Sequence, residues 1–211
     1  MEYSHQNFIH QAIEVRDHFN IRPGGADVSG FPLFALFNTG MGMTTVFPKM
    51  DFTRPADVAP QRFLEAASYW KADQAFGSPA LWNTVSRWCE TNHKSMPSIR
   101  RAFSAGAPVP AHVLERVKKM IAADGEVYTP YGATEALPVA CNSATVVLSE
   151  TSSATDLGKG VCVGRKFPGI EWKVVEITDE PIESIDQARE VPPGEIGELI
   201  VKGPVVTRRY V

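Results

Sequence analysis

The stretch EVYTPYGATEALPVA, Glu126 to Ala140, joins a strand-like run to a glycine, a threonine and a glutamate. If a helix begins near Ala133, its free N–H groups attract an anion, and the Thr134 hydroxyl adds a donor. Glu135 repels a phosphate unless a divalent cation lies between them, and Mg²⁺ takes such a carboxylate. An ordinary helix cap explains Thr and Glu equally well. Both interpretations stay open on these residues alone.

Strand-like and helix-like segments alternate along the sequence before Glu126. The strand-like runs are FPLFALF (31–37), MTTVF (43–47), DQAFG (73–77), IRRAFSAG (99–106) and EVYTPY (126–131). The helix-like segments are 6–19, 60–70, 79–89 and 110–121. Repeated strand–helix units with short links predict a parallel sheet covered by helices. Ligands of such sheets bind beyond the carboxyl ends of the strands.

Apolar spacing also predicts which parts of these helices are buried. In segment 6–19 one helical face is expected to hold Phe8, Ile9, Ala12, Ile13 and Phe19. Ser78 is placed to cap the helix that follows it, and Pro79 suits its first turn.

The loop SAGAPVP, Ser104 to Pro110, leaves the carboxyl end of one predicted strand. Gly106 lets the backbone turn sharply and lets another group approach it closely. Such a loop makes a flat slot for a planar ring, although a simple Gly/Pro connector explains it better when it is taken alone. Tyr131, beyond the next strand, offers an aromatic face. A ring slot, an aromatic face, a phosphate donor and a magnesium ligand at one edge of a sheet together describe an ATP site.

Composition excludes several other classes of function. The 211 residues are 44% hydrophobic and 21% charged, with a net charge of −3, which is ordinary for a soluble globular protein and a poor match to nucleic acid. The longest apolar run is too short to span a bilayer, and the N-terminus does not resemble a signal peptide. Three widely spaced cysteines indicate reduced thiols in a cytoplasmic protein.

Other motifs of catalysis and metal binding do not occur. The five histidines lack metal-ligand spacing, and neither a G-x-S-x-G elbow nor a G-x-x-x-x-G-K-[ST] loop is found. The segment GKGVCVGR, 158–165, is interpreted as a turn with a basic surface residue.

The spacing of apolar residues changes from about Gly158 onward, where the helical period is no longer found. IEWKVVEI (170–177) and EIGELIVKG (195–203) alternate apolar and polar residues and are separated by a polar connection, which predicts antiparallel strands. We therefore expect an α/β fold, with a parallel sheet flanked by helices in residues 1–150. A β-rich part, a small antiparallel sheet or partial barrel, is expected in residues 151–211.

Four ordered motifs resemble the adenylate-forming superfamily, which includes acyl-CoA synthetases and luciferases. They are SAGAPVP, YTPYGATE, VGRKFPG and GEIGELIVKGP, and the resemblance covers essentially the whole chain. It implies a nucleotide site in which Tyr131 stacks on adenine, Thr134 contacts the α-phosphate and Glu135 binds Mg²⁺. Further residues implied for the adenine slot are Gly106, Ala107, Pro108 and Gly132. Those implied for the acyl pocket are Phe76, Gly77, Ser78, Ala105 and Ala133.

FPLFALF, TRPADV, FGSPAL and TPYGATEALPVA look like the olefin β-lactone synthetases of bacterial hydrocarbon biosynthesis. This implies ATP-dependent activation of a long-chain β-hydroxy acid, which then closes to a β-lactone, and other enzymes of that pathway as partners. A fatty acyl-CoA ligase, with CoA as a further substrate, is the alternative. Many such ligases carry a histidine where this chain has Ala35, which favours the lactone. A non-catalytic nucleotide-binding module is an alternative of another class.

The superfamily resemblance also implies elements outside this sequence. A Gly-rich phosphate loop with its lysine is expected before Tyr3. A ribose-binding aspartate, a hinge and a domain with a catalytic lysine are expected after Val211. The resemblance thus implies that the chain corresponds to the central portion of a larger enzyme, and the isolated chain is expected to be inactive.

Overall fold

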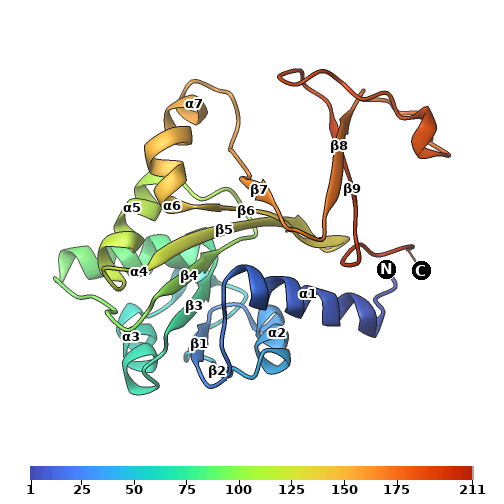
Figure 1. The fold of residues 1–211 in the computed structure, drawn as a ribbon. Coiled ribbons are helices and arrows are strands. Elements are labelled where there is room, and N and C mark those ends of the chain that lie inside the picture. The colour runs from blue at the N-terminus through green and yellow to red at the C-terminus, as the bar shows by residue number, and fades with distance from the viewer. Residues whose placement is uncertain (211) are drawn as a thin grey trace.

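A seven-stranded sheet with helices on both faces forms the centre of the computed structural model, which describes residues 1–210 (Figure 1). The strand order is β2-β1-β3-β4-β5-β6-β7. The strands are β1 (Ala26–Ser29), β2 (Thr44–Val46), β3 (Gln74–Gly77), β4 (Arg101–Ser104), β5 (Glu126–Ala133), β6 (Ala136–Ser143) and β7 (Arg165–Lys166). Strands β1 to β5 pair in parallel, whereas β6 pairs antiparallel with both β5 and β7. The expected α/β class is confirmed.

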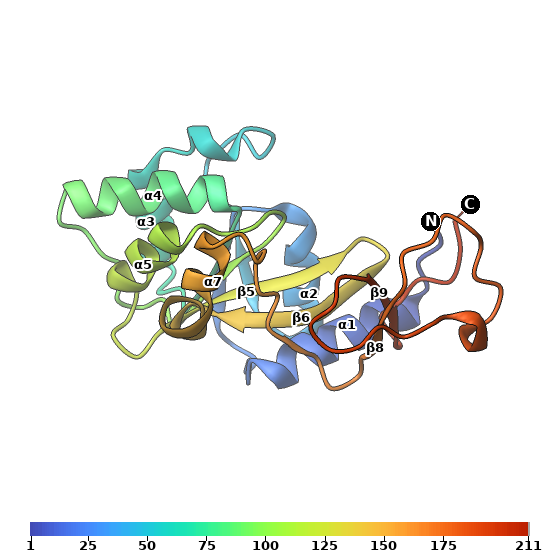
Figure 2. The ribbon, with the colours of Figure 1, turned by 90° about the horizontal axis from the view of Figure 1, so that it is seen from above.

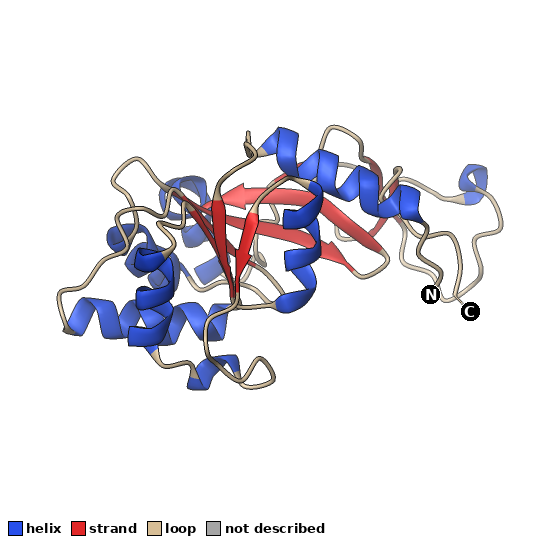
Figure 3. Cartoon of the chain, turned by 90° about the horizontal axis from the view of Figure 1, so that it is seen from below, coloured by secondary structure: helices blue, strands red, loops and turns tan. Residues whose placement is uncertain are grey.

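Two groups of helices cover the opposite faces of this sheet (Figure 3). One group is α1 (His5–His18) and α2 (Ala35–Gly40), and the other is α3 (Pro60–Tyr69), α4 (Pro79–Thr91) and α5 (Ala111–Met120). The short helices α6 (Ala144–Val146) and α7 (Ser152–Asp156) follow β6. Because side chains alternate along a strand, Val28 and Ala102 pack with the helices α3 to α5, and Phe103 packs on the other face with Phe19.

The start of α4 agrees with the sequence. The Ser78 hydroxyl accepts a hydrogen bond from the backbone N–H of Leu81 at 3.2 Å, and Pro79 lies in the first turn. Leu81 and Trp82 are fully buried. The cap therefore fixes a helix that begins directly beyond β3.

The prediction of a strand in FPLFALF is wrong. Pro32–Phe34 forms a 3₁₀ turn that leads into α2. A continuous apolar run of this length fits a buried strand or a helix, and the proline suits the start of a helical turn. Phe34, Phe37 and Met41 then recur at helical spacing and pack on the same core cluster.

The prediction of the buried face of α1 is also wrong in part. Ile9 is 58% exposed and Ile13 is 37% exposed, whereas Asn7 and Gln11 are buried. Only Phe19, just past the helix, is fully in the core as expected. The spacing of apolar residues did not reveal the buried face of α1, because Asn7 and Gln11 on that face form hydrogen bonds with polar groups.

The β-rich part contains the expected antiparallel pair. Strands β8 (Glu171–Val175) and β9 (Glu198–Lys202) form a separate two-stranded sheet. They lie beyond the far end of the large sheet, beside the two chain ends (Figure 1).

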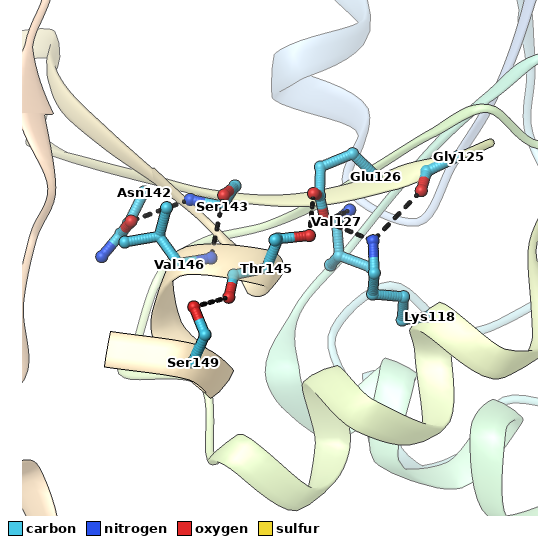
Figure 4. Close-up of polar contacts among 9 residues, drawn as sticks. All are labelled: Lys118, Gly125, Glu126, Val127, Asn142, Ser143, Thr145, Val146 and Ser149. Carbon is cyan, nitrogen blue, oxygen red and sulfur yellow. Dashed lines mark hydrogen bonds and ion pairs between the residues drawn. The ribbon is translucent and has the colours of Figure 1, made fainter. Parts of the chain in front are cut away.

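A polar cluster lies at the open end of the β5–β6 hairpin, where β5 begins and β6 ends (Figure 4). The Glu126 carboxylate accepts hydrogen bonds from Lys118 Nζ at 3.2 Å and from Thr145 Oγ1 at 2.5 Å. Ser143 Oγ accepts from the N–H of Val146 at 3.2 Å and so caps α6. Since α5, β5 and α6 meet here, the hairpin leaves the sheet from a fixed base.

Candidate functional site

The opening stretch forms a β-hairpin, and the expected helix start near Ala133 is wrong. Ala133 ends β5 and Ala136 begins β6. A helix through this stretch would place Pro138 in its second turn, where proline removes a backbone hydrogen bond. The turn at Thr134 and Glu135 therefore joins two strands, and the argument from a helix dipole does not apply to it. Seen from above, the hairpin extends from the large sheet towards α1 and the β8–β9 sheet (Figure 2).

The first hollow of the site lies between the loop after β4 and the upper part of β5. It has a volume of about 470 Å³. Its walls include five residues expected in the adenine slot: Gly106, Ala107, Pro108, Tyr131 and Gly132. The structure thus brings together the loop after β4 and the end of the neighbouring strand β5. Gly106 has a φ of +94°, which glycine adopts without strain.

The sequence did not identify several other residues of this hollow. Val161, Cys162 and Val163 line it, although their segment was interpreted as a surface turn. Ser104 lines it as well, is 1% exposed, and its Oγ has no hydrogen-bond partner among the described residues. A buried hydroxyl without a partner costs free energy, so it fits a site where a ligand supplies the missing bond. Ser104 could have been identified from its position where a predicted strand meets the loop SAGAPVP.

A second hollow, of about 460 Å³, shares Gly106 and Ala107 with the first. Phe76, Ser78 and Ala105, all expected in the acyl pocket, line it together with other mostly apolar residues. A third, narrower cavity of about 70 Å³ shares Phe76 and Ala105 with the second and continues beneath α2. A planar polar group and an apolar chain can therefore be held next to each other at Ala105–Ala107.

Two expected pocket residues lie outside these hollows. Gly77 packs behind them, where an added Cβ would come within 2.7 Å of Leu81 Cδ2. Ala133 lies at the exposed end of β5, next to the hairpin turn. The hairpin itself requires a glycine at position 132, because an added Cβ would lie 2.7 Å from the Ala136 carbonyl oxygen.

Thr134 and Glu135 lie at the tip of the hairpin and line neither of the two larger hollows that share Gly106. The Tyr210 hydroxyl donates to Glu135 Oε1 at 2.7 Å. This hydrogen bond is the main cause that lowers the pKa of Glu135, so its carboxylate is ionised at neutral pH.

A buried carboxylate lies at the inner end of the third cavity. Asp27 is 2% exposed, and burial raises its pKa to about 6. Its Oδ2 accepts from Asn38 Nδ2 at 2.8 Å, while its Oδ1 has no partner among residues 1–210. The sequence did not identify this residue, because no strand was expected over Ala26–Ser29.

The described part of the chain contains no group of three or more His, Cys, Asp or Glu side chains arranged to hold a metal. Within the same residues, none of the helices combines the length and apolar character needed to cross a membrane.

Comparison with known proteins places this geometry in a family. The family model described as AMP-binding enzyme matches residues 2–211. Olefin β-lactone synthetases from Xanthomonas campestris pv. campestris and Stenotrophomonas maltophilia are each 39% identical over 208 residues, or 99% of this chain. The chain covers only 36% and 37% of those two proteins. A long-chain-fatty-acid–CoA ligase from Bacillus subtilis is 27% identical over 134 residues, which are 64% of this chain and 20% of that protein.

The fold agrees with that of a solved member. The O-succinylbenzoate coenzyme A synthetase of Bacillus subtilis, in complex with AMP, superposes with a TM-score of 0.72 at 20% identity. The match covers 97% of this chain and 38% of that protein. Because the family model spans nearly all residues and the fold agrees, this chain belongs to the family of AMP-binding, adenylate-forming enzymes.

Proposed function

We propose that this chain carries the adenine slot and the acyl pocket of a ligase that activates a long-chain β-hydroxy acid as acyl-AMP and closes it to a β-lactone. The observation that carries the proposal is the meeting of two hollows at Gly106 and Ala107, one beside Tyr131 and the other mostly apolar. The 39% identity to two olefin β-lactone synthetases supports the choice of substrate class.

The residues present fit ATP as a substrate. The volume of the first hollow, about 470 Å³, is in the range of small-molecule sites. The unpartnered Ser104 hydroxyl gives the slot a buried polar atom to pair with a base edge. Tyr131 is 41% exposed, which leaves its ring accessible for stacking.

The residues also fit Mg²⁺ held between protein and phosphate. Mg²⁺ keeps several waters and commonly takes one or two protein carboxylates plus substrate phosphates. Glu135 supplies one such carboxylate, which its lowered pKa keeps ionised. When bound, Mg²⁺ would supply positive charge to the phosphate oxygens. The chain's own contribution is to present the Glu135 carboxylate and the Thr134 hydroxyl from one rigid turn.

The proposed chemistry has two steps. A carboxylate oxygen of the acid forms a bond to the α-phosphorus of ATP, and pyrophosphate leaves. The β-hydroxyl oxygen of the same acid then attacks the acyl carbon, loses its proton, and AMP leaves. The apolar hollow holds the chain so that the carboxyl end reaches Ala105–Ala107, which makes the first step effectively unimolecular.

A fatty acyl-CoA ligase is the second candidate, favoured by the long-chain-fatty-acid–CoA ligase among the relatives. Ala35, which begins α2 and is 6% exposed, lacks the imidazole that many such ligases carry at this position. The full-length protein that includes this chain should be given a long-chain β-hydroxy acid, ATP and Mg²⁺, with and without CoA. We expect a β-lactone and AMP without CoA, identified by mass spectrometry.

Strict dependence on CoA with a thioester product would instead establish the second candidate. Binding of ATP without release of pyrophosphate would favour a non-catalytic module. In the same assay, the isolated 211-residue chain should release no pyrophosphate, because we propose that the site also requires parts of the enzyme outside this sequence.

A further inference from the structure

Helix α1 turns a polar face towards the protein, which is unusual for a helix that covers a sheet. Asn7 is 9% exposed and Gln11 is fully buried, while Ile9 remains 58% exposed. Burying amides is unfavourable unless they are hydrogen-bonded. Their partners therefore show what this face is for.

Gln11 connects α1 to the hairpin turn through one intervening side chain. Gln11 Nε2 donates to the Tyr3 hydroxyl at 3.0 Å. The Tyr3 hydroxyl in turn donates to the backbone carbonyl of Thr134 at 2.8 Å. The Tyr3 ring packs on Phe8 with its centroid 5.2 Å away, which fixes the direction of the hydroxyl. A buried amide thus holds the peptide of Thr134.

Asn7 connects α1 to the other side of the same turn. Its Nδ2 donates to the carbonyls of Pro204 at 2.9 Å and Val206 at 3.1 Å. The segment that it holds, residues 204–210, then reaches the turn by main chain and by side chain. The Thr207 N–H donates to the Glu135 carbonyl at 2.8 Å, and Val206 forms a β-bridge with Ala136.

The last contact in this series is made to the Glu135 carboxylate itself. The Tyr210 hydroxyl donates to Oε1 at 2.7 Å, and Oε2 has no such bond in the described structure. The segment is tied back to the N-terminal one, because Arg209 pairs with Glu2 and the Glu2 N–H donates to the Arg209 carbonyl at 3.0 Å. Both chain ends accordingly lie side by side (Figures 1 and 2).

We infer that Tyr3 and Tyr210 are positioning residues that hold Thr134 and Glu135 in the geometry needed for metal and nucleotide binding. The inference rests on the proposed function of these two residues. Without this contact, a glutamate side chain at a hairpin tip would sample many rotamers, and ordering it on binding would weaken the affinity. With Oε1 held by Tyr210, Oε2 is left to face a cation. Hydrogen bonds to ligating carboxylates commonly set metal affinity in this way.

The test uses the full-length protein that includes this chain and compares Tyr210→Phe and Tyr3→Phe with a control, Tyr69→Phe. Tyr69 is 82% exposed and its hydroxyl makes no hydrogen bond in the described structure, so its loss should change nothing. Calorimetric titration with ATP at a series of Mg²⁺ concentrations gives the metal concentration for half-maximal nucleotide binding. The melting temperature is recorded for each variant.

We expect about a tenfold higher Mg²⁺ requirement for Tyr210→Phe, with a melting temperature close to the wild-type value. Tyr3→Phe should shift the requirement in the same direction by a smaller factor, because it acts through the backbone of the turn. An unchanged Mg²⁺ requirement in both variants, with ATP still bound, would overturn the positioning role and leave the proposed function intact. A lowered melting temperature with unchanged Mg²⁺ dependence would also overturn it, since that is the signature of a structural contact only. Failure of the wild-type protein to bind ATP at any Mg²⁺ concentration would overturn the proposed function together with this inference.

Discussion

At Asp27, burial opposes ionisation of a carboxyl group. It lies on β1 with both neighbouring strands in place, and only Oδ2 has a hydrogen-bond partner, Asn38, among the described residues. Burial is the largest cause of its raised pKa, and the hydrogen bond from Asn38 lowers it again in part. The charged form is therefore poorly compensated, and the protein is less stable when Asp27 is ionised.

Ionisation of Asp27 should therefore lower the free energy of unfolding as the pH rises. The pKa of Asp27 is about 6 in the folded state and about 4 in the unfolded chain, so the folded state holds more protons between these values. The contribution of Asp27 is fully present below pH 4 and is lost as the pH rises through 6, by roughly 3 kcal/mol. We expect Asp27→Asn to remove this slope, as measured by urea unfolding from pH 4 to about 7.5.

The isosteric Asp27→Asn variant also reports on whether the fold itself is preserved. Its side-chain amide keeps an oxygen that can accept the hydrogen bond from Asn38, so the fold should persist. Near neutral pH the variant should be more stable than the wild type, because it carries no buried charge. An identical pH profile for the variant and the wild type would contradict the assignment of this slope to Asp27.

Helix α4 packs against the strand that leads into the first hollow. The Trp82 side chain is fully buried, and its Nε1–H donates to the Phe103 carbonyl at 2.8 Å. Phe103 lies on β4 directly before Ser104 and the loop that lines the first hollow. This hydrogen bond connects the helix that borders the second hollow to the strand that leads into the first.

Replacing the Trp82 indole should weaken the packing between α4 and β4. Trp82→Phe leaves a buried carbonyl without its partner and a small void, and we expect a loss of about 2 to 3 kcal/mol in the free energy of unfolding. Trp70→Phe is the matched control, because Trp70 is 51% exposed. Equal stability losses for the two variants in urea would show that the Trp82 hydrogen bond contributes nothing specific.

At the scale of the whole molecule, the regular parts of the fold could be predicted from the sequence. Repeated apolar periods with clear caps, such as Ser78 before α4, identified α3, α4, α5 and four of the five parallel strands. Strand β1 (Ala26–Ser29) was missed, because two of its four residues are polar. FPLFALF was misassigned because an unbroken apolar run does not distinguish a strand from a helix. Helix α1 was misassigned on one face because its polar side chains bind partners almost two hundred positions away in the chain, and local spacing does not encode such contacts.

The candidate site was predictable where it depends on loops at strand ends. Gly106 to Pro108 and Tyr131 do meet in one hollow, as expected. The prediction failed for the backbone of Thr134 and Glu135, because a threonine and a glutamate suit a helix start and a hairpin turn equally well. Val161 to Val163 were missed since their approach depends on the pairing of β7 with β6, which joins distant segments.

The division into residues 1–150 and 151–211 remains a proposal. Strand β7 from the second part completes the large sheet, whereas β8 and β9 form their own sheet. Tyr3 from the first part and Thr207 and Tyr210 from the second part all contact the hairpin tip.

We propose that Glu135, at this tip, is part of the adenylation site. The most direct measurement is acid-dependent ATP–pyrophosphate exchange by the full-length protein, comparing the wild type with Glu135→Gln. The glutamine keeps the shape of the side chain and an oxygen for Tyr210 but removes the negative charge, so we predict that the exchange rate falls by about a hundredfold while the melting temperature hardly changes. An exchange rate close to that of the wild type would contradict the claim and remove Glu135 from the mechanism.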